Sequence, residues 1–425
     1  MIDATELGSR LKNARERLGL TQEQVAGQLG LSRGALAQVE LGMRAPNSLQ
    51  LARLAEIYKR DLGEFLAVEF DAAGRDALVA LFRSDSQIAE DPARAAAVRR
   101  CVNLAREYTH LEDLLGIAAD RPAPPEYDLP LPRNRWDAIQ QGERLAEEER
   151  DRLGLGTDPI RDIRIVLEQQ GIRVLKEDLL PENVSGVFLN DQHHGLSIIV
   201  NGSHHSRRRL FSYAHEYAHA LADRDVASLV SRVENRAELR EVRANAFAAA
   251  FLMPEVGVRA FMRSRGKGDA PSVLQVFDGS EALTAQRRAV SRNQEVQLYD
   301  VVHAASHFGA SFDSALYRLL NLRVISEAQR ERFADQRDIA NAIRSEFFDE
   351  SEQEDEQLQH PHKDFLFLAL DAYRRAEISR GKLDELAELA DAPAGFDQLA
   401  REAEAELDEE EESEVLLPPT ATSAR

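Results

Sequence analysis

Residues 215–219 contain the pattern His-Glu-x-x-His, in which His215 and His219 stand four positions apart. On a helix, residues with this spacing lie on one face, so both imidazoles can bind the same metal ion. Glu216 follows the first histidine, where a carboxylate can take a proton from an attacking water molecule and deliver it to a leaving amine. The pattern predicts a site with one Zn²⁺ per chain that is able to hydrolyse a peptide bond.

A catalytic zinc ion normally has three protein ligands and one open position, so a third ligand is needed. The helical segment 233–251 offers three acidic candidates, Glu234, Glu238 and Glu241. Asn245 lies one helical turn after Glu241 and is a candidate to hydrogen-bond a ligand. The five-residue pattern is only moderately specific, because it also arises by chance on surface helices that bear two histidines.

The elements that must position these residues are helices and a few strands. Helical periodicity over residues 136–170 is followed by three segments of strand character, 171–175, 184–189 and 196–200. Residues 196–200 fit an exposed edge strand that pairs with an extended substrate as well as they fit a core strand. Beyond them the pattern is mostly helical to about residue 347.

A second motif lies near the N-terminus, where two short amphipathic segments are separated by Gly30. Thr21 and Ser32 are good N-caps for the two helices. The apolar positions then face one another, which leaves Arg33 and Gln38 on the outer face of the second helix. Arginine and glutamine are the side chains that read guanine and adenine edges in the major groove, so this pair of helices predicts binding to double-stranded DNA.

Charge and composition restrict how the chain can meet nucleic acid. The 425 residues carry a net charge of −21, which excludes a protein that coats DNA indiscriminately. Residues 1–66 hold nine Lys and Arg against eight Asp and Glu, a net charge of +1. We therefore expect DNA contact through residues 1–66 with modest affinity, which a homodimer on two half-sites would raise. The alternative is a small helical domain used for protein contacts.

Cysteine content and hydropathy indicate the compartment. Cys101 is the single cysteine, so an intramolecular disulfide and a cysteine-rich zinc site are both excluded. The N-terminus lacks a signal-peptide pattern, and no segment approaches ~20 uninterrupted apolar residues. We expect a cytoplasmic protein without membrane contact.

Residues 8–66 resemble the XRE family of helix-turn-helix proteins, which includes Cro and the phage repressors. The resemblance covers the Thr-Gln pair that begins the first helix of the motif and Glu40 after the second. It implies a five-helix domain whose DNA contacts fall at Gln22, Arg33 and Gln38.

Residues 136–330 resemble the ImmA/IrrE family of zinc metallopeptidases. The similarity includes the run into the first histidine (208–215), the segment 241–254 and the segment 315–322, with an insertion near 262–296. It implies a zincin-like α+β domain with a small sheet, the zinc ligands His215, His219 and Glu241, and Glu216 as the catalytic base. Members of the family cleave transcriptional repressors in response to stress, so the resemblance implies a repressor or other regulatory protein as substrate.

Arg243 departs from this family pattern, because many relatives have an acidic residue there. We expect it to leave the ligand set intact and to make the rim of the site less acidic. Tyr213 and Tyr217 are candidates to stabilise an oxyanion. His303 and His307 also stand four apart, without a glutamate at the base position, and whether either reaches the active site is left open.

The sequence thus predicts a mainly α protein with one α+β domain. The expected parts are a helix-turn-helix DNA-binding domain (1–68), a helical connector with a Pro-rich linker (69–135), a zinc metallopeptidase domain (136–347), an acidic linker (348–362), a C-terminal helical module (363–407) and an acidic disordered tail (408–425). Two alternatives to a proteolytic regulator remain. One is a non-proteolytic regulator whose second domain senses a metal or ligand, and the other is the peptidase of a toxin–antitoxin or phage-defence system.

Overall fold

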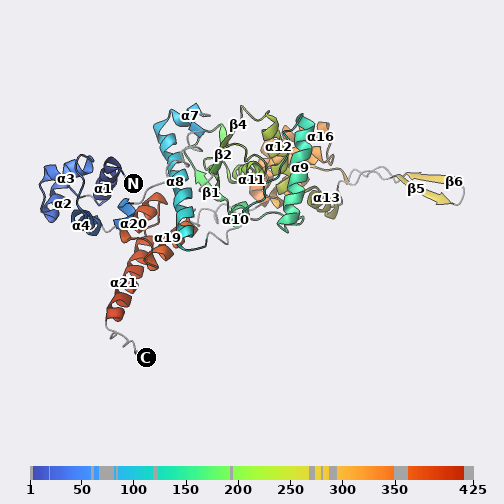
Figure 1. Ribbon diagram of the computed structural model, residues 1–425. Helices are drawn as coiled ribbons and strands as arrows, with labels where there is room; N and C mark the ends of the chain where they lie inside the picture. Colours follow the sequence, from blue (N-terminus) through green and yellow to red (C-terminus); the bar gives the residue numbers. More distant parts are fainter. Residues whose placement is uncertain are drawn as a thin grey trace, which may run out of the picture. The chain divides into compact units, whose positions relative to one another are not determined.

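A computed structural model describes the chain over residues 3–18, 20–58, 62–66, 81–82, 85–117, 123–191, 195–267, 273–278, 281–286, 294–348 and 362–415. These residues form two compact units, shown with their elements in Figure 1. The first comprises Met1–Ala73, Val102–Asp120 and His360–Arg425, and the second comprises Gly74–Cys101 and Arg121–Gln359. The division falls within one helix, α8 (Pro92–Leu114). The predicted acidic linker lies almost entirely outside the described residues, and the predicted domain limits stay predictions.

The N-terminal part of the first unit has the five predicted helices. They are α1 (Ala4–Arg17), α2 (Gln22–Leu29), α3 (Arg33–Glu40), α4 (Ser48–Tyr58) and α5 (Leu62–Leu66). Thr21 and Gln24 form a capping box at the start of α2, and the Ser32 side chain caps α3. Gly30 ends α2 with φ 68°, a left-handed conformation that side chains other than glycine rarely adopt.

The C-terminal part of the same unit is helical as predicted, with α19 (Lys363–Arg374), α20 (Arg380–Leu389) and α21 (Phe396–Val415). The disorder expected from residue 408 was wrong for the first part of the tail, because α21 continues to Val415. Its glutamates, alanines and leucines have high helix propensity, and the run of negative charge does not prevent helix formation there. No described helix is both long and apolar enough to cross a membrane.

A four-stranded sheet forms the centre of the second unit. Its strands are β1 (Arg173–Glu177), β2 (Val184–Asp191), β3 (Gly195–Asn201) and β4 (Ser228–Arg232), in the order β1-β3-β2-β4. β1 runs parallel to β3, and the other two pairings are antiparallel. The three predicted strands are present. However, β3 pairs on both sides, so the hypothesis of an exposed edge at 196–200 was wrong, and β4 forms an edge instead.

Both faces of this sheet are covered. On one face, α11 (Ser206–Ala222) packs against Phe188 and Ile198. On the other face Val187 and Ile199 are also fully buried, and Figure 1 shows α7 (Ser86–Ala89) and the first part of α8 on that side. Asp85, just before α7, holds Arg232 of β4 through an ion pair of 2.6 Å. The sheet is therefore a buried layer between helices.

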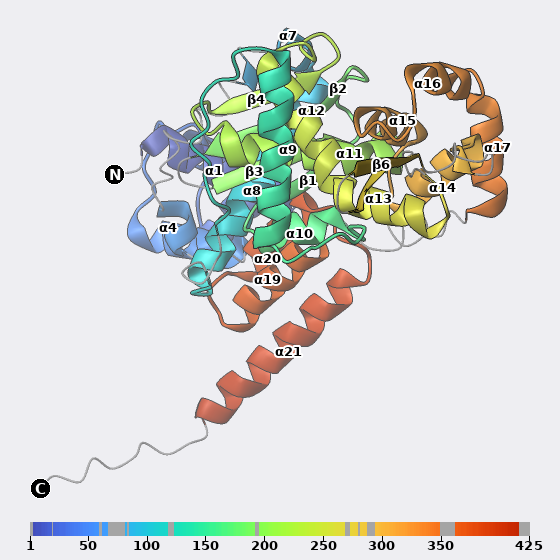
Figure 2. The ribbon, with the colours of Figure 1, turned by 90° about the vertical axis from the view of Figure 1, so that its right-hand side faces the viewer.

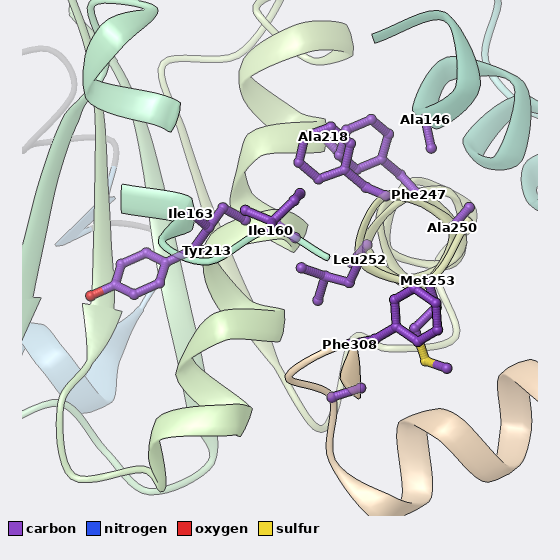
Figure 3. Packing of buried hydrophobic residues seen from close by; sticks show 14 of the residues in the cluster. Ala146, Ile160, Ile163, Tyr213, Ala218, Phe247, Ala250, Leu252, Met253 and Phe308 are labelled. Carbon is purple, nitrogen blue, oxygen red and sulfur yellow. The ribbon is translucent and has the colours of Figure 1, made fainter. Parts of the chain in front are cut away.

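Helices also surround α11 on its far side. α12 (Leu239–Leu252) packs between α11 and α9 (Arg135–Arg152), as Figure 2 shows. A Cβ at Gly142 of α9 would collide with the backbone of Arg243 and Phe247 on α12, so the close packing of these helices requires glycine. In Figure 3, Phe247 lies beside Ala218 of α11. This packing fixes α12 relative to α11.

The remaining elements of the second unit follow the helical prediction apart from one hairpin. The helices are α10 (Ile163–Gln169), α13 (Glu255–Ser264), α14 (Leu298–His307), α15 (Phe312–Asn321), α16 (Glu327–Ala334) and α17 (Arg337–Phe347). The predicted insertion near 262–296 contains an antiparallel hairpin, β5 (Val273–Asp278) and β6 (Glu281–Gln286).

Candidate metal centre and helix-turn-helix surface

Two helices, α11 and α12, bring together three side chains that could bind a metal ion. His215 and His219 lie one turn apart on α11, and Glu241 lies in the first turn of α12. His215 Nε2 is 3.1 Å from Glu241 Oε2 and 3.2 Å from His219 Nε2. His219 Nε2 is 3.5 Å from Glu241 Oε1. All three side chains are buried, and they are the group of potential metal ligands found in the described part of the chain.

The spacing of these atoms fits a tetrahedral zinc ion. Ligands about 2.0–2.1 Å from such an ion lie about 3.3 Å from one another. The observed separations of 3.1, 3.2 and 3.5 Å bracket this value. Two imidazole nitrogens and a carboxylate are also a donor set that catalytic zinc sites use, with one position left open. The residues therefore fit the cofactor expected from the sequence.

Hydrogen bonds orient both histidines toward the common point. His219 Nδ1 donates to Asp223 Oδ2 at 2.9 Å, and His215 Nδ1 lies 3.1 Å from Asn245 Oδ1. With a proton on Nδ1, each neutral ring presents the lone pair of Nε2 to the site. Asn245 thus contacts a potential ligand, as its position one turn after Glu241 predicted. Asp223 was missed, although its position four residues after His219 places it on the same helix face.

The carboxylates make this pocket favourable for positive charge. Burial raises the pKa of Glu241, but hydrogen bonds from His215 and His219 outweigh it and hold the pKa at about 2. Burial lowers the pKa of His219, but hydrogen bonds to Asp223 and Glu241 outweigh it and raise the pKa to about 10. Glu241 is therefore ionised, and the pocket favours positive charge at its centre, which either protons on the imidazoles or a metal ion bound to the neutral rings can supply.

Arg243 is part of this network rather than of the rim. Its side chain is buried and donates to Asp223 Oδ1 at 2.6 Å, while Arg240 lies 3.0 Å from the same oxygen. The expectation of a less acidic rim was wrong, because the close packing of α12 on α9 buries Arg243 beside Gln141. The charge of Arg243 acts on His219 through Asp223.

Glu216 lies beside the three potential ligands, in an environment that is costly for a carboxylate. Its side chain is fully buried, and neither carboxylate oxygen has a hydrogen-bond partner among the described residues. Burial raises its pKa. A Cβ at Gly186 of β2 would lie 2.6 Å from Glu216 Oε1, so glycine makes room for the carboxylate. An unpartnered buried carboxylate is costly, and such groups concentrate at functional sites.

Of the three acidic candidates, only Glu241 reaches the histidines. Glu234 instead accepts a hydrogen bond from Asn183, and Glu238 is exposed at the N-cap of α12. The Tyr217 hydroxyl donates to the buried carboxylate of Glu149 on α9, so its suggested role at an oxyanion was wrong. Tyr213 is buried in the hydrophobic core of the second unit.

His303 and His307 lie on α14 and pack against Phe261 of α13, with ring centroids 5.4 and 4.5 Å away. His303 Nε2 is also 2.9 Å from Nη2 of Arg265. Neither histidine belongs to the cluster of His215, His219 and Glu241. Their contacts are those of packed surface aromatics.

The residues expected to contact DNA lie on the helix-turn-helix surface. Arg33 and Gln38 are exposed on α3. Gln22 is half-buried at the start of α2, and its Nε2 donates to Glu40 at 2.9 Å. Glu40 is itself buried and forms an ion pair of 2.6 Å with Arg15 of α1. The ion pair thus ties α1 to α3, and the hydrogen bond to Glu40 holds Gln22 against them.

The hydrogen bond from His219 to Asp223 yields a prediction for metal affinity. Asp223→Ala leaves the Nδ1 proton without its acceptor, and we expect zinc affinity to fall 10–100-fold. Competition with a chromogenic zinc chelator measures this. Asp225→Ala is the matched control, because Asp225 binds Arg240 at 2.7 Å but contacts no potential ligand. Equal affinities in the two variants would contradict the role of Asp223.

Comparison with known proteins places both motifs in families. Residues 167–320 match a peptidase family described as the IrrE N-terminal-like domain, and residues 11–65 match the helix-turn-helix family. The chain is also 36% identical over 62 residues to the ImmF control region 10 kDa protein of Bacillus phage phi105, a match that covers 15% of this chain and 69% of the phage protein. The chain belongs to the XRE-type helix-turn-helix family and carries, behind that domain, a peptidase-family domain of the ImmA/IrrE type.

Proposed function

We propose that this protein is a DNA-binding, zinc-dependent endopeptidase that cleaves a regulatory protein, a transcriptional repressor in the first instance, in response to stress. One observation carries the proposal. Three potential ligand groups converge at zinc-like spacing, and the buried, unpartnered carboxylate of Glu216 lies beside them. A purely structural metal site has no need of such a carboxylate. The two family matches agree with this combination of domains.

In this proposal His215, His219 and Glu241 would hold the zinc ion, which would act as a Lewis acid toward the scissile carbonyl and the attacking water. Glu216 accepts a proton from the attacking water and delivers it to the amine that leaves. Its raised pKa suits both steps, because the carboxyl group must gain and lose a proton within one cycle. Asp223 and Asn245 keep the two imidazoles in position throughout.

The edge strand β4 offers a place for the substrate chain. Gly186, which touches Glu216, pairs with Ser231 of β4. The strand edge therefore passes next to the proposed base. An extended peptide that adds to a sheet edge is held through its backbone, which suits a peptidase that acts on an unfolded segment.

Glu216→Gln separates proteolysis from binding. We expect this variant to retain zinc and DNA binding but to lose cleavage by 10²–10⁴-fold, because the amide cannot accept the proton. Mass spectrometry of new protein N-termini, in cells that produce wild type or variant, measures cleavage and identifies the bond. Glu147→Gln, at an exposed position of α9, is the matched control.

The result also separates the proposal from its rival. New N-termini that appear with wild type and Glu147→Gln but not with Glu216→Gln would support proteolysis. Normal regulation by Glu216→Gln would identify a metal-sensing regulator without turnover.

We further propose that Gln22, Arg33 and Gln38 contact DNA and that a homodimer binds two half-sites. Arg33→Ala is expected to reduce discrimination between operator sequences by about 1–3 kcal/mol, measured by selection from random DNA at fixed salt. Arg53→Ala on α4 is the control, because Arg53 is exposed and pairs with Glu56. Unchanged selectivity in Arg33→Ala would contradict the assignment. If DNA binding brings the peptidase to its target, Arg33→Ala also slows cleavage in cells.

A further inference from the structure

Some of the backbone hydrogen-bonding groups on the free edge of β4, near Glu216, are already bound by a side chain of this protein. The backbone N–H of Asn190 on β2 donates to the carbonyl oxygen of Ala227, so the backbone groups of Ala227 point toward β2. Two residues further along, those of Leu229 point toward β2 as well. Backbone groups alternate along a strand. The N–H and C=O groups of Val230 therefore point away from β2, and past the bulge those of Arg232 do as well.

The side chain of Asn235 binds both of these residues. Its Nδ2 donates to the carbonyl oxygen of Val230 at 2.8 Å, and its Oδ1 accepts from the backbone N–H of Arg232 at 3.0 Å. A carboxamide has one donor side and one acceptor side, as a peptide group has. Asn235 thus supplies the donor and the acceptor that a neighbouring strand would supply at this point of the edge.

Ser231 lies between Val230 and Arg232 and relates this part of the β4 edge to Glu216. Its partner across the ladder is Gly186, the residue against which Glu216 packs. Ser231 is buried, and as the ladder partner of Gly186 it faces the same side of the sheet, toward α11. A peptide strand that paired with Val230 and Arg232 would therefore run past Glu216.

We infer that the side chain of Asn235 is a latch on the free edge of β4. It binds the backbone C=O of Val230 and N–H of Arg232, which an extended peptide substrate needs for pairing. The side chain must therefore move away before the peptide can bind. This inference rests on the proposed peptidase function and assigns a regulatory residue to the same site. The latch closes the edge to weak or occasional strand partners. A substrate binds only when its other contacts compensate for the two hydrogen bonds that are lost.

The replacement of the Asn235 side chain by a peptide requires only a local change in the loop that carries Asn235. Asn235 lies in the turn between β4 and α12, and its own carbonyl oxygen accepts from the backbone N–H of Glu238. Asn183 contacts the same turn elsewhere, through a hydrogen bond of 3.0 Å to Glu234. Rotation of the Asn235 side chain frees the edge without breaking the backbone hydrogen bond of the turn.

Binding in the full-length, zinc-loaded protein tests the latch. Fluorescein-labelled casein serves as an unfolded peptide probe, and Glu216→Gln as the background that prevents hydrolysis. Removal of the carboxamide in Asn235→Ala is expected to lower the Kd for casein about tenfold, as measured by fluorescence anisotropy. Asn183→Ala is the matched control, since it removes a side-chain contact of the same turn but leaves the edge of β4 untouched.

Amide hydrogen exchange places the effect on β4. The Arg232 amide should exchange faster in Asn235→Ala than in the parent protein, and casein should slow it again. Equal Kd values for Asn235→Ala and Asn183→Ala, or no casein binding in any variant, would overturn the inference. Tighter binding in Asn235→Ala, with no hydrolysis when Glu216 is restored, would keep the latch and reject the proposed peptidase activity instead.

Discussion

The convergence of three acceptor groups on one point is the constraint around which the second unit is built. Two imidazole nitrogens and a carboxylate, 3.1–3.5 Å apart and out of solvent, are stable together only with positive charge between them, either protons on the imidazoles or a metal ion. Their approach has to be enforced by the surrounding fold. Helix packing and the hydrogen bonds of the two histidines to Asn245 and Asp223 hold the three groups together.

Two glycines and several buried charged side chains fix the positions of the helices that carry these groups. Gly142 lets α9 approach α12, which carries Glu241, and Gly186 lets β2 approach Glu216. Behind the ligands, Asp223 and its arginine partners fix the ring of His219. On the other side of α11, the hydrogen bond of Tyr217 to Glu149 anchors the same helix to α9. The helix α11 is thus held from both sides, and Glu216 is fully buried between this helix and β2.

Local patterns in the sequence predicted much of this arrangement. The spacing of His215 and His219 is a property of one helix, and the capping residues Thr21 and Ser32 are defined by their immediate neighbours. Family resemblance, rather than spacing, singled out Glu241 from its acidic neighbours. Asp223 was open to the same i, i+4 argument that identified the histidines.

The errors share a non-local cause. Whether β3 is an edge or an interior strand depends on β1 and β4, and β4 has only five residues, too few for a clear alternating pattern. Arg243 is charged and would be exposed on an isolated helix, but α9 buries it. The partner of the Tyr217 hydroxyl, Glu149, lies 68 positions away in the sequence. The sequence pattern predicts which residues are neighbours along one helix. The position of the edge strand, the burial of Arg243 and the partner of Tyr217 depend instead on which helices and strands pack together.

The metal content of the purified protein tests the proposed zinc site directly. Elemental analysis after dialysis, on wild type beside Glu241→Ala and Glu238→Ala, compares the proposed ligand with an acidic residue of the same segment. We expect about one zinc ion per chain in wild type and Glu238→Ala and its loss in Glu241→Ala. Absence of zinc from the wild-type protein after reconstitution, or full retention by Glu241→Ala, would contradict it.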